Sequence, residues 1–202
     1  MHTESSSIVG AGGHAKVVFE AMQVIGINDV MVWDEDPSLE GKIFLDTHVR
    51  TLLDIKFLSR YSHIAIGDSK MRLKLTNLLL SVGKEVITVI HPEATVSKYS
   101  FIKAGCFIAA KSVVAPSSRL GAGVIVNHGA IIDHECNVGA FSHIAPHATL
   151  GGGVTIGDCC LIGSGAVVLP GLIIGNSVTV GAGAVVVSNI KEGRIVYGVP
   201  AK

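Results

Sequence analysis

The chain has 202 residues, no formal net charge, 24 glycines, and a composition that is 49% hydrophobic and 16% charged. Soluble domains carry about 25% charged residues and about 7% glycine on average, so charge is depleted here and glycine is enriched. This composition excludes a disordered chain, which needs low hydrophobicity and high net charge, and collagen, which needs glycine at every third position. Balanced charge also gives no electrostatic sign of a nucleic-acid partner.

A membrane span is considered because the mean hydropathy is +0.54. The longest charge-free stretch, residues 159–190, is interrupted by glycines and by Pro170, so it is not a continuous apolar block of about 20 residues. The N-terminal segment has no signal-peptide pattern. We therefore expect a cytoplasmic protein without membrane insertion, in which the four cysteines are reduced packing residues.

Charge and glycine are distributed unevenly along the chain. Residues 1–89 hold 20 of the 32 charged residues and 7 of the 24 glycines, whereas residues 90–202 hold 12 and 17. The sequence therefore predicts two domains, 1–89 and 90–202, with a short junction between them.

The first domain is predicted to be an α/β unit. Apolar runs predict strands at residues 5–9, 30–33, 63–66 and 85–89, and helical patterns cover residues 16–24, 48–58 and 69–82. About 85 residues are enough for one mononucleotide-binding half of a dinucleotide fold. We therefore expect a Rossmann-like mononucleotide-binding domain that holds a nucleoside diphosphate, with NAD as a less favoured ligand.

Glycines follow the first predicted strand. Gly10, Gly12 and Ala15 match the G-x-G-x-x-G/A fingerprint, in which the chain approaches a phosphate at a helix N-terminus. Asp34, at the end of the second predicted strand, is placed to accept a hydrogen bond from a ribose hydroxyl. The motif by itself is a weak indication of nucleotide binding. Its position between a predicted strand and a predicted helix strengthens that indication.

The second domain has a six-residue period. Stepping by six from Ile90 to Val186 meets only Ile, Leu or Val, at seventeen positions in succession. A period this short predicts a β-solenoid, and the pattern resembles the left-handed parallel β-helix of the hexapeptide-repeat acyltransferases, in which 18 residues make one triangular coil. These enzymes are trimers with active sites between neighbouring prisms, so the resemblance implies a homotrimer.

Histidines interrupt this apolar domain at His128, His134, His143 and His147. His134 differs from the others because Asp133 and Glu135 flank it in a region with few charges. A neutral histidine is the usual general base near pH 7, and a carboxylate orients it. One coil further on, Gly152 has no side chain, which predicts room for a substrate and an N–H group for an acyl oxygen.

The whole chain resembles the bacterial nucleotide-sugar N-acetyltransferases of the PglD type and the related NeuD-type sialic acid O-acetyltransferases. The resemblance rests on motifs along the chain: Gly-Ala-Gly-Gly-His-Ala-Lys at 10–16, Ala-Ile-Gly-Asp at 65–68 with Arg72, Ile-His-Pro-Glu-Ala at 90–94, Asn127-His128, His134-Glu135-Cys136, Ser142-His143 and the final Gly-Val-Pro-Ala-Lys. It implies acetyl transfer from acetyl-CoA, without a metal, to the amine of a UDP-linked 4-amino-4,6-dideoxy sugar in surface glycan synthesis.

The resemblance also implies roles for individual residues. His134 is the general base and Glu135 orients it. Acetyl-CoA is expected to contact His143, Gly152, Ala182, Val199 and Pro200. The nucleotide-sugar is expected to contact Gly10, Gly12, Gly13, His14, Asp34, Gly67 and Asn127.

Three other functions remain open at this stage. A sialic acid O-acetyltransferase would use the same motifs. A zinc enzyme similar to the γ-type carbonic anhydrases would recruit the histidines of the second domain as ligands. A non-enzymatic scaffold is disfavoured because it would need neither His134-Glu135 nor the glycine loop.

Overall fold

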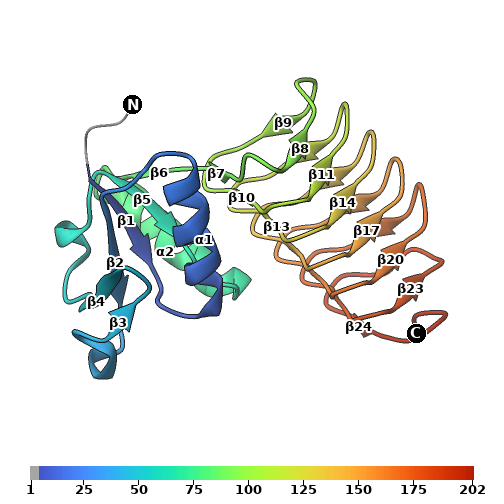
Figure 1. Cartoon of the computed structure of the whole chain (residues 1–202). Helices are drawn as coiled ribbons and strands as arrows, with labels where there is room; N and C mark the ends of the chain where they lie inside the picture. Colours follow the sequence, from blue (N-terminus) through green and yellow to red (C-terminus); the bar gives the residue numbers. More distant parts are fainter. Residues whose placement is uncertain (1–4) are drawn as a thin grey trace.

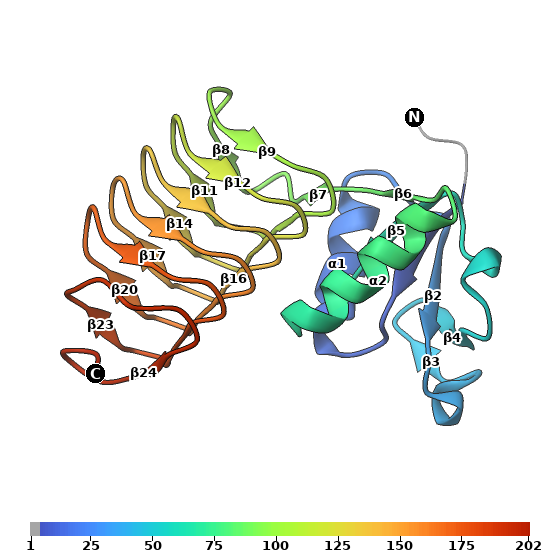
Figure 2. The ribbon, with the colours of Figure 1, turned by 180° about the vertical axis from the view of Figure 1, so that it is seen from behind.

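The computed structural model describes residues 5–202 and has two parts, an N-terminal α/β unit and a three-sided β-helix (Figure 1). Figure 2 shows the same two parts from behind, with the two helices of the first unit lying close to the β-helix. The predicted fold class, a Rossmann-like unit followed by a left-handed parallel β-helix, is confirmed. The predicted border between residues 89 and 90 falls inside β7 (Val89–Ile90), the first strand of the β-helix.

The N-terminal sheet has the strand order β3-β4-β2-β1-β5-β6. All of its pairs are parallel except the β3–β4 hairpin. Its strands are β1 (Ser6–Val9), β2 (Val30–Asp34), β3 (Ile43–Phe44), β4 (Thr47–Thr51), β5 (Tyr61–Ile64) and β6 (Glu85–Val86). The chain leaves β1 toward β2 and leaves β5 toward β6, so the sheet changes direction between β1 and β5, where α/β sheets bind ligands.

Two α-helices cover opposite faces of this sheet. Helix α1 (Gly13–Val24) buries Val18 and Met22 in one apolar cluster with Ile8. Helix α2 (Ser69–Ser81) buries Leu75 in a second cluster with Val9. Ile8 and Val9 belong to different clusters because successive strand residues point to opposite faces.

The predicted helix at residues 48–58 is wrong. This segment forms β4 and the short 3-10 helix η2 (Ile55–Phe57), and another 3-10 helix, η1 (Pro37–Leu39), precedes β3. The side chain of Asp54 accepts a hydrogen bond from the Lys56 N–H, which holds a tight turn where a continuous helix was expected. Only Val49 of β4 is buried, and this alternation of exposed and buried residues is typical of a strand.

The β-helix consists of three parallel sheets, one on each side of a triangular prism. Face A contains β7, β10 (Phe107–Ile108), β13 (Ile125–Val126), β16 (His143–Ile144), β19 (Leu161–Ile162), β22 (Thr179–Val180) and β24 (Ile195–Val196). Face B contains β8 (Thr95–Val96), β11 (Val113–Val114), β14 (Ile131–Ile132), β17 (Thr149–Leu150), β20 (Val167–Val168) and β23 (Val185–Val186). Face C contains β9 (Phe101–Ile102), β12 (Arg119–Leu120), β15 (Asn137–Val138), β18 (Thr155–Ile156) and β21 (Ile173–Ile174).

The 18-residue coil predicted by the six-residue period is confirmed by the strand register, since Phe107 pairs with Ile125 and Ile131 pairs with Thr149. The second residue of each two-residue strand points inward and builds the core. Corners recur every six residues in the left-handed region, and some are occupied by residues other than glycine, such as Glu135 (φ 59°) and Cys159 (φ 54°). The last coil is shorter, because Thr179 pairs with Ile195.

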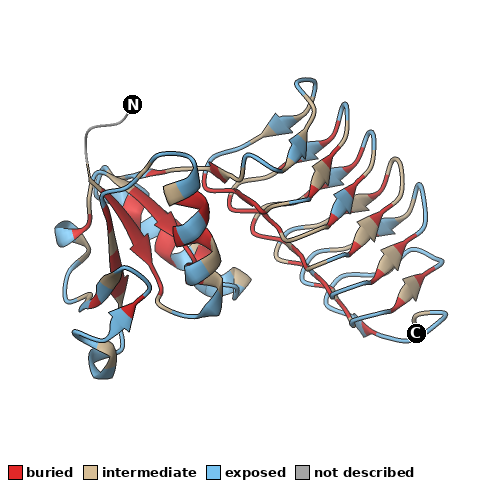
Figure 3. Ribbon diagram, viewed as in Figure 1, coloured by how far each residue is buried: buried red, intermediate tan, exposed pale blue. Residues whose placement is uncertain are grey.

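The N-terminal unit packs on the first coils of face A. The outward residues Val89, Phe107 and Ile125 are fully buried and belong to the same apolar cluster as Ile8. Figure 3 shows the resulting run of buried residues on the side of the β-helix that faces the N-terminal unit. The two parts therefore share one core, which fixes the position of the α/β unit on the prism.

Candidate functional site

His134 lies at the corner between faces B and C, directly after β14. Its Nδ1 lies 3.2 Å from Oε2 of Glu135, and its backbone N–H donates a hydrogen bond to Asp133 Oδ1 at 2.7 Å. Most of the imidazole is exposed, with 59% of the side chain accessible. The pair therefore presents an oriented, accessible imidazole, as a general base requires.

Glu135 occupies a left-handed corner, with φ of 59°. An L-residue is disfavoured there, and glycine fills the next two corners along this edge, Gly153 and Gly171. Strained positions of this kind are concentrated at functional sites. At this corner the backbone of Glu135 places its carboxylate beside the imidazole of His134.

Gly152 lies directly next to the imidazole, as the coil arithmetic predicts. A Cβ atom built on Gly152 would lie 2.6 Å from both Cε1 and Nε2 of His134. The expectation that the missing side chain leaves room for a substrate is therefore wrong. That space holds the ring of His134 itself, and the glycine allows the imidazole to lie against the backbone of the next coil.

The glycine-rich loop, which is predicted to bind the nucleotide, connects β1 to α1 at the point where the sheet changes direction. Gly10 has φ of 108°, and a Cβ on it would lie 3.0 Å from the carbonyl oxygen of Ala65. Helix α1 begins at Gly13 without a side-chain cap at Gly12 and without an acidic residue in its first turn. Its first N–H groups can therefore bind an anion.

Asp34 and Glu35 lie at the end of β2, beside this loop. Asp34 accepts hydrogen bonds from the N–H groups of Ala11 (2.8 Å) and Asp36 (3.0 Å), so its carboxylate fixes the loop against β2. Each carboxylate oxygen keeps a second lone pair, so the ribose contact expected from Asp34 stays a prediction. Glu35 accepts no hydrogen bond within the described residues, and it lines a hollow of about 150 Å³ together with Gly10 and Ile66.

The interface between the α/β unit and face A contains three histidines. The ring of His14 lies 5.3 Å from that of Phe107 and 6.3 Å from that of His143, measured between centroids. Asn127 Nδ2 donates to His143 Nε2 at 3.1 Å. His63 donates from Nδ1 to the carbonyl oxygen of Ile87 at 2.9 Å.

Burial keeps these three histidines uncharged. Burial, together with the positive charge of Arg72 as a smaller cause, lowers the pKa of His14 to about 3 and the pKa values of His63 and His143 to about 4. His14 Nε2 is buried and has no hydrogen-bond partner among the described residues. The predicted site residues His14, Asn127 and His143 thus form one neutral polar group beside the glycine-rich loop.

Arg72 was not among the residues predicted for the site, although it belongs to the motifs that carry the family resemblance. It lies in α2 and is only 1% exposed. The sequence contains a signal for this, because positions 72, 75, 76 and 79 form the buried stripe of the helix, and Arg72 is the one charged residue on it.

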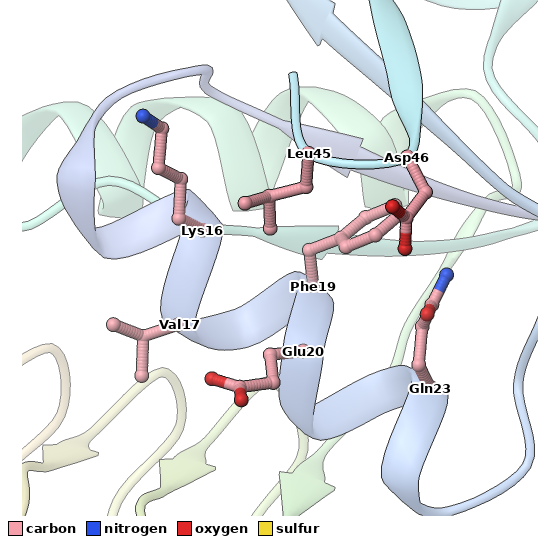
Figure 4. Close-up of a pocket in the computed structure, with 7 residues that line it drawn as sticks. All are labelled: Lys16, Val17, Phe19, Glu20, Gln23, Leu45 and Asp46. Atoms are coloured by element: carbon pink, nitrogen blue, oxygen red, sulfur yellow. The ribbon is translucent and has the colours of Figure 1, made fainter.

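Two further hollows involve residues of the α/β unit. A cleft of about 660 Å³ separates Gly67 and Ser69 of the α/β unit from His143, Cys159 and Thr179 of the β-helix. The other, of about 420 Å³, lies between α1 and the turn after β3, where Phe19, Leu45 and Asp46 are among the residues that line it (Figure 4). None of the predicted site residues lines this second hollow, whereas the interdomain cleft contains Gly67 and His143.

Most of the predicted site residues fall into two separate groups, and three others lie near the end of the β-helix. The first group lies where the α/β unit meets face A and the corner between faces A and B. It contains the glycines of the loop after β1 together with His14, Gly67, Asn127 and His143. His134, Glu135 and Gly152 lie at the other edge of face B. Ala182 lies at the corner between faces A and B near the end of the β-helix, and Val199 and Pro200 lie in the exposed C-terminal turn.

The described residues show neither a metal-binding cluster nor a membrane-spanning helix. The part of the chain from residue 5 onward contains no group of three or more His, Cys, Asp or Glu residues arranged to hold a metal ion. Within the same residues, neither α-helix has the length and apolarity needed to cross a membrane.

Comparison with known proteins identifies the family. Residues 7–79 match the PglD N-terminal domain, and residues 153–188 match the bacterial transferase hexapeptide repeat. A GDP-perosamine N-acetyltransferase of Escherichia coli O157:H7 is 30% identical over 171 residues, which cover 81% of this chain and 77% of the relative. The chain belongs to the PglD/NeuD family of hexapeptide-repeat acetyltransferases.

Two solved structures extend this relationship over nearly the whole chain. The acetyltransferase domain of PglB from Neisseria gonorrhoeae, in complex with acetyl coenzyme A, is 37% identical with a TM-score of 0.93, covering 98% of each chain. A GDP-perosamine N-acetyltransferase variant from Caulobacter crescentus, in complex with CoA and GDP-perosamine, is 36% identical with a TM-score of 0.91, covering 98% of this chain and 95% of the other. The predicted enzyme class, an acetyl-CoA-dependent sugar N-acetyltransferase, is confirmed.

Proposed function

We propose that this enzyme transfers the acetyl group of acetyl-CoA to the amine of a nucleoside-diphosphate-linked amino sugar, with His134 as the general base. The observation that carries this proposal is the His134–Glu135 pair, accessible at a corner and packed against Gly152. The uncapped N-terminus of α1 supplies a site for the diphosphate. His14, Asn127 and His143 line the region between that site and the β-helix.

The chemistry needs no covalent intermediate on the enzyme. The sugar nitrogen attacks the thioester carbonyl, and His134 Nε2 takes the proton that the nitrogen loses. Glu135 holds Nδ1 and stabilises the imidazolium that forms. The C–S bond then breaks, and the CoA thiolate receives the proton from His134. The buried cysteines are poor nucleophiles, since burial raises the pKa of Cys106 to about 11.

The two groups of site residues meet between subunits in the arrangement we propose. Face B presents uncharged outward residues along its whole length: Thr95, Val113, Ile131, Thr149, Val167 and Val185. If three chains turn face B toward a common axis, the Asn127 edge of one face lies beside the His134 edge of the next. A homotrimer then has three sites, each with the base from one subunit and the nucleotide loop from its neighbour.

For the nucleotide, we propose GDP in place of the UDP expected from the sequence. Both relatives named as perosamine N-acetyltransferases carry GDP in their names. Guanine offers two adjacent donors, N1–H and N2–H, and the unpaired carboxylate of Glu35 can accept both. Uracil offers one N–H flanked by two carbonyl oxygens, which repel the second oxygen of a carboxylate.

The test of catalysis uses labelled acetyl-CoA with GDP-linked and UDP-linked 4-amino-4,6-dideoxy sugars and with sialic acid. We expect label on the amine of the GDP-sugar. Transfer to sialic acid alone would replace the proposal with O-acetylation. Stoichiometric zinc together with carbon dioxide hydration would favour the zinc enzyme similar to the γ-type carbonic anhydrases. Absence of acetyl-CoA binding would favour a non-enzymatic scaffold. Preference for the UDP-sugar would refute the assignment of guanine and leave the reaction intact.

The test of the shared site uses mixed trimers. Subunits with His134→Ala and subunits with His14→Ala are each expected to have low activity. Denatured together and refolded, they form some sites that combine an intact base with an intact nucleotide loop. Activity should recover to a fraction of the wild-type value, whereas a site contained in one chain would show no recovery.

A further inference from the structure

Arg72 connects the two parts of the molecule through four backbone carbonyl groups. Its Nη1 donates to the carbonyl oxygens of Ile66 (2.8 Å) and Gly67 (2.9 Å), in the loop that follows β5. Its Nε donates to Gly123 (2.8 Å), and its Nη2 donates to Phe141 (2.5 Å). Gly123 and Phe141 lie one above the other on successive coils of the β-helix, at the corner between faces C and A.

This environment is unusual for a buried charge. Buried charged groups are normally paired with an opposite charge, but no described carboxylate forms a hydrogen bond or ion pair with Arg72. Desolvation lowers its pKa only to about 10, so it stays protonated at neutral pH. An apolar side chain would fill the same space without the desolvation penalty, so packing alone does not account for an arginine at this position.

The loop held by Arg72 lies where a nucleotide is expected. Ile66 lines the hollow that contains Glu35, and Gly67 lines the interdomain cleft with His143. Ala65 and Ile66 also contact Gly10 of the phosphate loop, since a Cβ on that glycine would lie 3.0 Å from each. A shift of residues 65–67 would therefore move one wall of the nucleotide site relative to the β-helix.

We propose that Arg72 is a positioning residue that sets the register between the nucleotide site and the acetyl-transfer site. The planar guanidinium directs two hydrogen bonds to each part, and this fork is not available to an apolar residue or to the single ammonium group of lysine. The role rests on the proposed function, because it acts only on an acceptor held by its nucleotide. An acceptor without a nucleotide should not depend on it.

The experiment compares two acceptors for each variant: the nucleotide-linked amino sugar and the methyl glycoside of the same amino sugar. The measured quantity is the ratio of kcat/KM for the first acceptor to kcat/KM for the second. A misplacement of about 1 Å costs about 10²-fold in rate. We expect Arg72→Met to lower this ratio between about 10-fold and 100-fold, while the KM for acetyl-CoA changes less than about twofold.

Two further variants distinguish a specific change in the ratio from a loss of folded protein. Arg72→Lys keeps the charge and should lower the ratio by at least about threefold, which gives a measurement even if Arg72→Met aggregates. Arg60→Met removes an exposed ion pair with Glu85 and should leave the ratio unchanged. Loss of folded protein would lower kcat/KM for both acceptors by the same factor and leave their ratio unchanged.

An unchanged ratio in Arg72→Lys and in any soluble Arg72→Met protein would overturn the proposal, whatever the absolute activity. A ratio near one in the wild-type enzyme has a different meaning: the nucleotide would then contribute nothing to catalysis, and the proposed function would fail before the role of Arg72 is tested.

Discussion

Gly152→Ala moves the proposed base without removing it. A methyl group at this position would lie 2.6 Å from Cε1 and Nε2 of His134, whereas ordinary contact begins at 3.4 Å. The ring must therefore withdraw by about 0.8 Å, and it is free to do so because 59% of the side chain is exposed. The backbone φ of Gly152 lies outside the left-handed region, so alanine adds no conformational strain.

The expected loss follows from this displacement. A misplacement of about 1 Å lowers an enzymatic rate by about 10²-fold, and loss of a general base costs about 10²- to 10⁴-fold. Gly152→Ala should therefore lower kcat by about 10- to 100-fold while the melting temperature changes little. The assay is steady-state release of CoA thiol with the nucleotide-linked acceptor.

The control is a double-mutant cycle with His134→Ala. Without the imidazole there is nothing for the new methyl group to displace, so Gly152→Ala should have almost no further effect. If the two losses multiply, the methyl group acts on acetyl-CoA directly and the glycine is a binding residue. Full activity of the single variant would refute the reasoning about the base.

The remaining predictions concern stability and assembly. Burial lowers the pKa of His63 to about 4, so the unfolded chain binds more protons than the folded chain between about pH 6.5 and pH 4, and His63 by itself should lower the free energy of unfolding by roughly 3 kcal/mol as the pH drops through this window. His14 and His143, whose pKa values are lowered in the same way, add to this fall, and His63→Gln should flatten the profile by the share of His63 in denaturant titrations. Ile132→Ala removes a fully buried ladder residue and should destabilise by about 2–5 kcal/mol in the same assay. Ile131→Asp places a charge on face B beside the His134 corner, and sedimentation should show dissociated, inactive chains; an intact trimer would argue against face B as the interface.

The β-helix could be predicted in detail because its sequence period is also its structural period. Each inward aliphatic residue repeats after six positions, so the register of every coil follows from counting. The position of Gly152 next to His134 came from the same count. What the count omitted was the direction of the imidazole, since a repeat specifies where a Cα lies but not which neighbour a side chain contacts.

The α/β unit was less predictable because its elements are defined by tertiary contacts. Residues 48–58 contain enough apolar positions for a helix, but the β2–β4 pairing and the turn at Asp54 determine their structure. Arg72 shows the same limit, because its four acceptors include Gly123 and Phe141, which are distant in the sequence. Local patterns show that an arginine is buried but not which groups bind it.

One coil of the β-helix carries almost all of the proposed chemistry. Asn127, His134, Phe141 and His143 occupy successive corners and sides within residues 127–143, which is less than one 18-residue coil. Neighbouring coils are about 4.8 Å apart, so a base displaced by one coil would be out of reach of the acceptor amine. Because Arg72 bonds to Phe141 and to the loop after β5, the nucleotide site is anchored to that same coil. In the trimer that we propose, the rigid period of the β-helix would place the base of a neighbouring subunit at the matching height when the three chains associate in register.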